Sequence, residues 1–82
     1  MKRAVIRVHL EEQPEGGYTV TSPDVPELIT EGETIAECLE NAQEVAQLLY
    51  ETYQEQGWAI PEAFREIPPM PQIDVAITVG LG

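Results

Sequence analysis

The chain has 82 residues, enough for one domain, and its apolar fraction of 43% is typical of a globular protein rather than a disordered one. Its 15 Asp and Glu residues outnumber its 4 Lys and Arg residues, for a net charge of −11. No Lys or Arg lies between Val8 and Phe64, so most of the chain lacks the basic side chains that neutralise phosphates in nucleic-acid-binding proteins. The composition argues against direct binding of DNA or RNA and favours basic proteins as partners, although the same acids could serve solubility alone.

The expected location of the protein follows from three further features of the sequence. Cys38 is the single cysteine, so no disulfide can form within the chain. The first residues alternate in charge and polarity instead of forming the apolar run of a signal peptide. No apolar run approaches the roughly 20 residues that a membrane-spanning helix needs. We therefore expect a cytoplasmic protein.

The first half of the chain predicts three strands. Residues 4–10 alternate between apolar and polar side chains, which is typical of a strand with one face in the core. The turn residues at 12–17 separate this strand from residues 18–21, so the two should form an antiparallel hairpin. Pro23 and Pro26 cannot donate to a sheet and end the second strand, and residues 28–30 form a short third strand.

A long amphipathic helix is predicted over residues 35–56. Thr34 and Glu37 have the spacing of a capping box at its start, and Gly57 is suited to its end. Apolar side chains recur at three- and four-residue spacing and form one stripe. The members of this stripe are Ile35, Leu39, Ala42, Val45, Ala46, Leu49 and Tyr53.

The rest of the chain predicts a connection and a fourth strand. Residues 58–72 are rich in proline but contain enough apolar side chains to pack over the helix end, with one helical turn at 62–66. Residues 73–79 alternate again and predict a strand that lies parallel to the first. A right-handed crossover then gives an α+β fold of order β-β-β-α-β, with a mixed four-stranded sheet in the order 3-2-1-4 and one helix on one face.

No catalytic or metal site is visible in the sequence. His9 is the only histidine and has no companions at ligand spacing, so we interpret it as a solvated strand residue. Cys38 lies near the apolar stripe of the helix and is interpreted as a packing residue. No phosphate-binding glycine loop or calcium-binding loop is present either. We predict a protein that is not an enzyme, with no cofactor and no metal.

Several short motifs together resemble those of the HicB-like antitoxin family. They cover most of the chain, which we take as a single HicB-like domain, residues 1–82. The matching motifs are residues 18–22, the turn Pro23-Asp24-Val25-Pro26, Gly32 and Thr34 before the helix, Glu37, Leu39, Asn41 and Ala42 within it, and residues 57–61 after it. Glu27, where the family usually has glycine, and Cys38, where it usually has alanine, depart from the pattern.

The resemblance implies a partial ribonuclease H fold without catalytic acids. Ribonuclease H enzymes take an essential acid from their first strand, and residues 4–10 contain none. Asp74 starts the fourth predicted strand without obvious partners, so metal-dependent nuclease activity is disfavoured. Cleavage by the purified protein that is lost on Asp74→Asn would revive it.

The resemblance also implies a function by binding. HicB-like proteins block HicA, a small basic mRNA-cleaving toxin, and many also carry a C-terminal DNA-binding module. Because the chain ends at Gly82, directly after the fourth predicted strand, we expect no such module here. Homo-oligomers are expected, since a core this small gains from further buried surface. The alternative is an orphan adaptor domain that self-associates and has no toxin.

Candidate contacts for a basic toxin are the acids of the strand-to-helix loop and of the first half of the helix. They could equally be a solvated face without a partner. The set is Asp24, Glu27, Glu31, Glu33, Glu37, Glu40 and Glu44.

Overall fold

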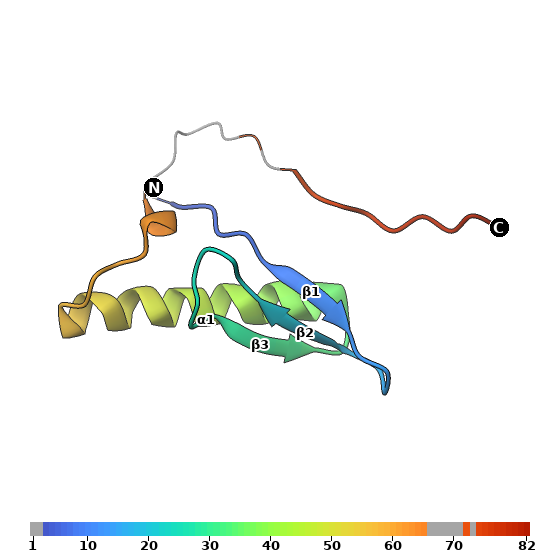
Figure 1. Cartoon of the computed structure of the whole chain (residues 1–82), viewed down its shortest axis with the longest axis horizontal. Helices are drawn as coiled ribbons and strands as arrows, with labels where there is room; N and C mark the ends of the chain where they lie inside the picture. Colours follow the sequence, from blue (N-terminus) through green and yellow to red (C-terminus); the bar gives the residue numbers. More distant parts are fainter. Residues whose placement is uncertain (1–2, 66–71, 73) are drawn as a thin grey trace.

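The computed structural model describes residues 3–65, 72 and 74–82. It is an α+β structure in which one long helix packs against a three-stranded antiparallel sheet (Figure 1). The elements are β1 (His9–Glu12), β2 (Tyr18–Thr21), β3 (Ile29–Gly32), α1 (Ile35–Gln56) and the 3-10 helix η1 (Glu62–Phe64). The predicted α+β class is confirmed.

The hairpin of β1 and β2 forms as predicted, because two consecutive glycines allow its turn. Gly16 and Gly17 take φ values of 103° and 77°, in the left-handed region that other residues rarely adopt. The Gln13 backbone N–H donates to the Gly17 carbonyl at 2.9 Å and closes the turn. Residue His9 then pairs with Thr21, and β2 continues into β3 with the same antiparallel geometry.

The first strand was predicted over residues 4–10, but β1 begins at His9. Before His9, the side chains of Ser22 and Asp24 bond to the backbone of Arg7 on the side that faces β2. The Ser22 hydroxyl donates to the Arg7 carbonyl at 2.7 Å, and the Arg7 backbone N–H donates to the Asp24 carboxylate at 2.9 Å. Side-chain bonds therefore replace the sheet ladder where Pro23 cannot pair.

The third strand was predicted over 28–30, whereas β3 spans Ile29–Gly32. Leu28 lies before it and is completely buried, and its N–H donates to the Val25 carbonyl in a turn. The strand therefore starts later than expected and includes Gly32, which packs directly against the helix.

The bounds of α1 match the prediction at both ends. The Thr34 hydroxyl accepts from the Glu37 N–H at 3.1 Å, which confirms the N-cap. The Glu37 carboxylate accepts from the Glu33 N–H at 3.4 Å, one residue earlier than in an ideal capping box. Gly57 ends the helix at φ 68°, in the left-handed region typical of a C-terminal cap.

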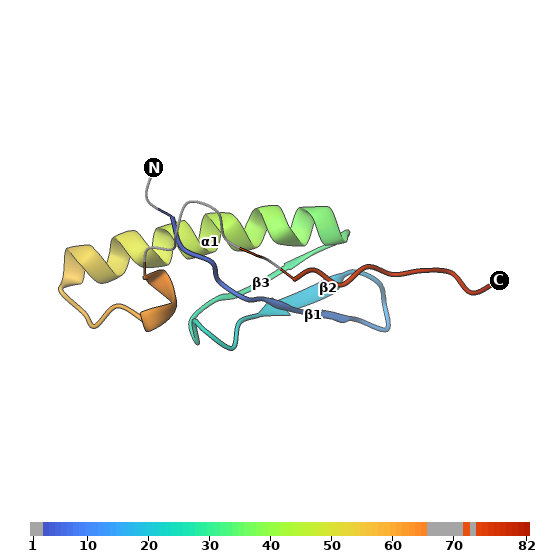
Figure 2. The ribbon, with the colours of Figure 1, turned by 90° about the horizontal axis from the view of Figure 1, so that it is seen from above.

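A small core lies between α1 and the sheet. The side chains buried there are Val20, Val25, Leu28, Cys38 and Ala42. Gly32 approaches α1 so closely that an added Cβ would lie 2.9 Å from the Cys38 sulfur. The end of α1 extends beyond the sheet, and η1 folds back onto it (Figure 2), where the Phe64 ring lies 5.2 Å from the Tyr50 ring.

The predicted fourth strand is wrong for the residues that the structure describes. Residues 74–82 form no strand, and the sheet order is β1-β2-β3 instead of 3-2-1-4. Figure 1 shows this stretch leaving the folded body as a separate extended segment. Its alternation of side chains is real, but a strand forms only where a neighbour completes its hydrogen bonds. Residue 73 and most of the predicted connection, residues 66–71, lie outside the described residues.

Candidate partner-binding surface

A row of carboxylates follows the outer side of α1 and begins just before the helix, at Glu33. With about 3.6 residues per turn, positions spaced by three, four and seven residues fall on one side of a helix. This side lies opposite Cys38 and Ala42, which face the core. We call it the acidic face; its exposed members are Glu33, Glu37, Glu40, Glu44, Glu51 and Glu55.

The acidic face has no basic counterpart within the described structure. The sequence supplies no Lys or Arg from Val8 to Phe64. Arg7 pairs with Asp24, and Arg65 pairs with Glu62 beyond the end of α1. In residues 3–65, 72 and 74–82 no carboxylate of the acidic face takes part in an ion pair. Such a row of unneutralised charge attracts a basic partner over several ångströms.

An apolar side chain interrupts the acidic face near its middle. Leu48 is 62% exposed although it lies on a helix whose other leucines turn further toward the sheet. A shallow, open depression surrounds it, lined by Gln43, Glu44, Gln47, Leu48 and Glu51. A single exposed apolar side chain is common on protein surfaces, so Leu48 alone does not mark a binding site, but it is available for contact within the acidic face.

Asp24, one of the predicted contacts, forms an ion pair with Arg7 of the same chain. Its carboxylate lies 2.6 Å from the Arg7 guanidinium and also accepts from the Arg7 backbone N–H. These hydrogen bonds hold the pKa of Asp24 below its ordinary value. Its side chain is only 15% exposed, so it serves the loop after β2 rather than an open surface.

Glu27 is also engaged. It accepts a hydrogen bond from the hydroxyl of Tyr53, a residue that is 5% exposed near the end of α1. Burial and this carboxylate together raise the pKa of Tyr53 to about 12. The glutamate that departs from the usual glycine therefore fixes the turn to the helix.

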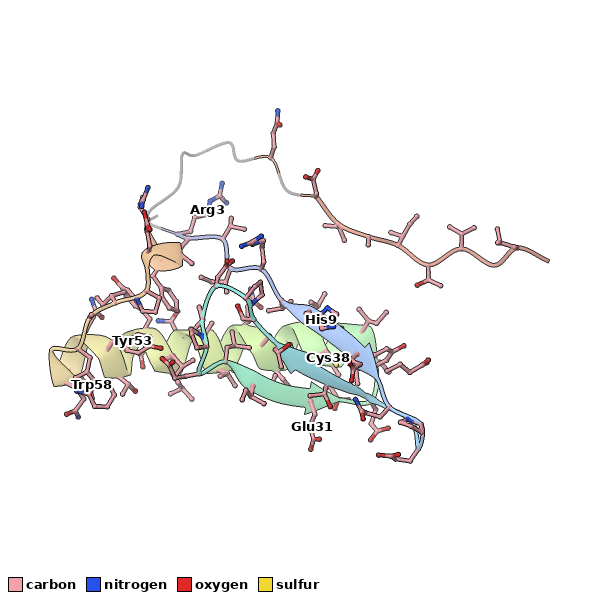
Figure 3. The ribbon with its side chains drawn as sticks, viewed as in Figure 1. Arg3, His9, Glu31, Cys38, Tyr53 and Trp58 are labelled. Carbon is pink, nitrogen blue, oxygen red and sulfur yellow. The ribbon has the colours of Figure 1, made fainter. Side chains whose placement is uncertain are left out.

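Glu31 lies on a different surface from the acidic face. On β3, Gly32 faces α1, so Glu31 points to the opposite side of the sheet (Figure 3). It pairs there with Thr19 of β2. Of the seven predicted contacts, the structure brings together only Glu33, Glu37, Glu40 and Glu44.

Sequence reasoning missed three residues of the same surface. Glu51 and Glu55 continue the acidic face, and Leu48 lies within it. The seven-residue spacing of Glu37, Glu44 and Glu51 was a signal that could have extended the set.

Two residues considered for chemistry have the roles predicted for them. His9 is exposed on the sheet face away from α1 (Figure 3). Cys38 is completely buried, and this burial raises the pKa of its thiol. The negative charges of Glu37 and Glu33 raise the same pKa to a smaller extent. Among the described residues, no three His, Cys, Asp or Glu side chains cluster in a way that could hold a metal ion. That part of the chain also contains no helix long and apolar enough to span a membrane.

Comparison with known proteins gives one family. The family model described as the HicB-like antitoxin of bacterial toxin–antitoxin systems matches residues 5–72. Antitoxin HicB of Escherichia coli strain K12 is 43% identical over 54 residues, which are 66% of this chain and 39% of that protein. Antitoxin HicB 1 of Photorhabdus laumondii is 44% identical over 54 residues, which are 66% of this chain and 35% of that protein. The chain thus matches less than two fifths of the length of these curated relatives.

Proposed function

This chain belongs to the HicB-like antitoxin family, and we propose that it neutralises a small, basic, HicA-like mRNA-cleaving toxin by binding it directly. The family and the named relatives support a role as the antitoxin of a toxin–antitoxin system. The observation that supports direct binding of a basic partner is the acidic face of α1, which has no counter-ion of its own in the described residues.

The acidic face is suited to binding a partner that itself binds RNA. A toxin that cleaves mRNA must present basic side chains to phosphates. A row of carboxylates spaced by three, four and seven residues offers those side chains an alternative to the phosphates, and Leu48 is available for an apolar contact within the row. From Glu37 to Glu55 the row is about 27 Å long, because each helical residue adds about 1.5 Å.

In this proposal the antitoxin inhibits the toxin by covering its RNA-binding surface and performs no chemistry of its own. Binding covers the RNA surface of the toxin, and inhibition lasts as long as the complex does. Complementary charge mainly speeds encounter, so association should be fast and should slow with added salt. The action takes place in the cytoplasm, where the mRNA substrate of the toxin is found.

The test is to purify the chain from its native source at low salt and identify what accompanies it. The expected companion is a small basic protein whose RNA cleavage stops when the purified chain is added back in equimolar amount. Recovery of a basic protein whose cleavage activity continues undiminished in the presence of the chain would overturn the proposal.

The orphan adaptor is a second candidate function, and one specific observation favours it. Residues 74–82 expose apolar side chains that nothing in the described structure covers. Recovery of the chain alone, as a defined oligomer, would support this reading.

A further inference from the structure

The single tryptophan of the chain is exposed just after the end of α1. Trp58 is 58% exposed, and Ile60, two residues later, is 43% exposed. Figure 3 shows Trp58 at the far end of α1, on the opposite side of the helix from η1. One exposed aliphatic side chain is common on a protein surface, but an exposed indole offers much more apolar area, and tryptophan is enriched in the centres of protein interfaces.

The segment that carries Trp58 is held at both ends. The Trp58 N–H donates to the Tyr53 carbonyl at 3.0 Å, which is one of the two hydrogen bonds of a Schellman helix end. Beyond Ile60, η1 returns to α1, and the Phe64 ring lies 5.2 Å from the Tyr50 ring and 6.1 Å from the Tyr53 ring. Because the segment is fixed in this way before any partner arrives, little conformational entropy is lost when a partner binds to it.

The acidic face leads along α1 to Trp58. Its last two members, Glu51 and Glu55, lie in the final two turns of the helix, and Trp58 follows Glu55 by three residues. No Lys or Arg lies between Glu51 and Trp58 to neutralise these charges. A basic partner that follows the acidic face to the end of the helix therefore reaches the indole.

An indole near carboxylates is chemically matched to a guanidinium or ammonium group. The face of the indole ring is rich in electrons and attracts a cation within about 6 Å of its centre. A planar guanidinium can stack on the ring while its N–H groups bond to a carboxylate. A second copy of this chain is matched less well, because a net charge of −11 on each copy opposes their approach.

We propose that Trp58 is an anchor of the toxin interface, on which an arginine or lysine side chain of the toxin stacks while other basic side chains of the toxin pair with the acidic face. This inference rests on the proposed function and adds a short-range contact to it. Charge on the acidic face acts at a distance and speeds association, whereas the indole acts only in contact and slows dissociation.

Fluorescence quenching tests the contact directly, because Trp58 is the only tryptophan of the chain. Acrylamide, a neutral quencher that the acidic face does not repel, should quench the indole of the free chain efficiently. Saturation with a tryptophan-free variant of a HicA-like toxin should lower the quenching constant at least twofold. An indole that is already shielded in the free chain, at every concentration or only at high concentration, is covered by the protein itself or by a second copy, and either result overturns the inference.

The same titration separates failure of the inference from failure of the proposed function. Calorimetry of the same mixture shows whether the toxin binds. A toxin that binds and leaves the quenching of Trp58 unchanged overturns the inference and leaves the proposed function standing. A toxin that does not bind overturns both.

Matched variants give a second test through the rates of binding. Trp58→Ala should raise the dissociation rate of the toxin about tenfold or more, as truncation of an aromatic anchor usually does, and leave the association rate within about twofold. Trp58→Phe keeps an aromatic ring and should lose less. Ile29→Ala is the control, because Ile29 is 64% exposed and lies on the sheet face away from α1. Circular dichroism checks that each variant keeps the helix. Equal dissociation rates for Trp58→Ala and Ile29→Ala would contradict the anchor.

Discussion

The Arg7 guanidinium and the Asp24 carboxylate form an ion pair at 2.6 Å that ties the stretch before β1 to the loop after β2. The carboxylate accepts from the side chain of Arg7 and from its backbone N–H. Asp24→Asn removes the charge from this contact and should lower the free energy of unfolding by about 1 kcal/mol or less, because the Arg7 side chain is 74% exposed and solvent screens the pair. Urea denaturation measures the change. Asp74→Asn alters an exposed aspartate and should have no effect.

The same pair predicts a dependence on acid. Hydrogen bonds from Arg7 hold the pKa of Asp24 below the ordinary value of 3.8. A carboxyl whose pKa is lowered by folding stabilises the fold above its unfolded pKa, and this contribution disappears as the pH falls through the folded value. The stability lost by Asp24→Asn should therefore be largest at neutral pH and shrink below about pH 4. A difference that stays constant from pH 7 to the acid transition would contradict the pairing.

Tyr53 and Glu27 predict a dependence on alkali. Burial, and then the Glu27 carboxylate, raise the pKa of Tyr53 from 10.0 to about 12. A raised folded pKa stabilises the fold below pH 10, and that stability is lost as the pH rises toward 12. Absorbance titration should show a tyrosine that ionises near pH 12, and Tyr53→Phe should remove this component.

Gly32 should not tolerate a side chain. A Cβ at this position would lie 2.9 Å from the Cys38 sulfur and 3.0 Å from the Cys38 backbone nitrogen. Gly32→Ala forces α1 away from β3 and should cost about 1–3 kcal/mol of stability, as overpacking usually does. Gly80→Ala, which meets nothing within 4 Å, is the control. Adding Cys38→Ala should restore only part of the loss, because the backbone contact remains.

Some of these features could be predicted from the sequence because they are local. Thr34 and Gly57 set the bounds of α1 through bonds to residues within a few positions, so pattern alone located both ends. The alternation at 74–80 is equally clear, yet residues 74–82 form no strand in the structure. A strand needs a neighbour that completes its hydrogen bonds, and such a non-local contact cannot be read from the pattern of side chains.

The sequence predicted that the candidate surface is acidic, but not which of its acids lie on that surface. Asp24 and Glu27 look like any other acid in the sequence, and only the fold shows that Arg7 and Tyr53 use them. Glu31 is near Glu33 along the chain but points to the opposite side of the sheet, because β3 alternates. The predicted contacts on α1, which are Glu37, Glu40 and Glu44, do lie on one surface, because the periodicity of a helix can be read from local sequence.

The acidic face should cost stability. Glu40 and Glu44 are four residues apart on α1, and like charges at this spacing repel. Glu44→Lys replaces the repulsion by an attractive pair and should raise the free energy of unfolding by about 0.5–1 kcal/mol. Glu15→Lys changes the net charge equally in the hairpin turn and serves as the control. A loss of stability on Glu44→Lys would show that Glu44 makes a contact that the structure lacks.

The most direct measurement of the central claim is calorimetric titration of a HicA-like toxin with two double variants of equal net charge. Glu40→Lys with Glu44→Lys reverses the middle of the acidic face, and Glu11→Lys with Glu31→Lys reverses two carboxylates on the opposite side of the sheet. The account predicts that the first variant weakens binding at least tenfold more than the second, and that the difference shrinks as salt is raised. Equal weakening by the two variants, or an affinity of the unmodified chain that does not change with salt, would contradict it.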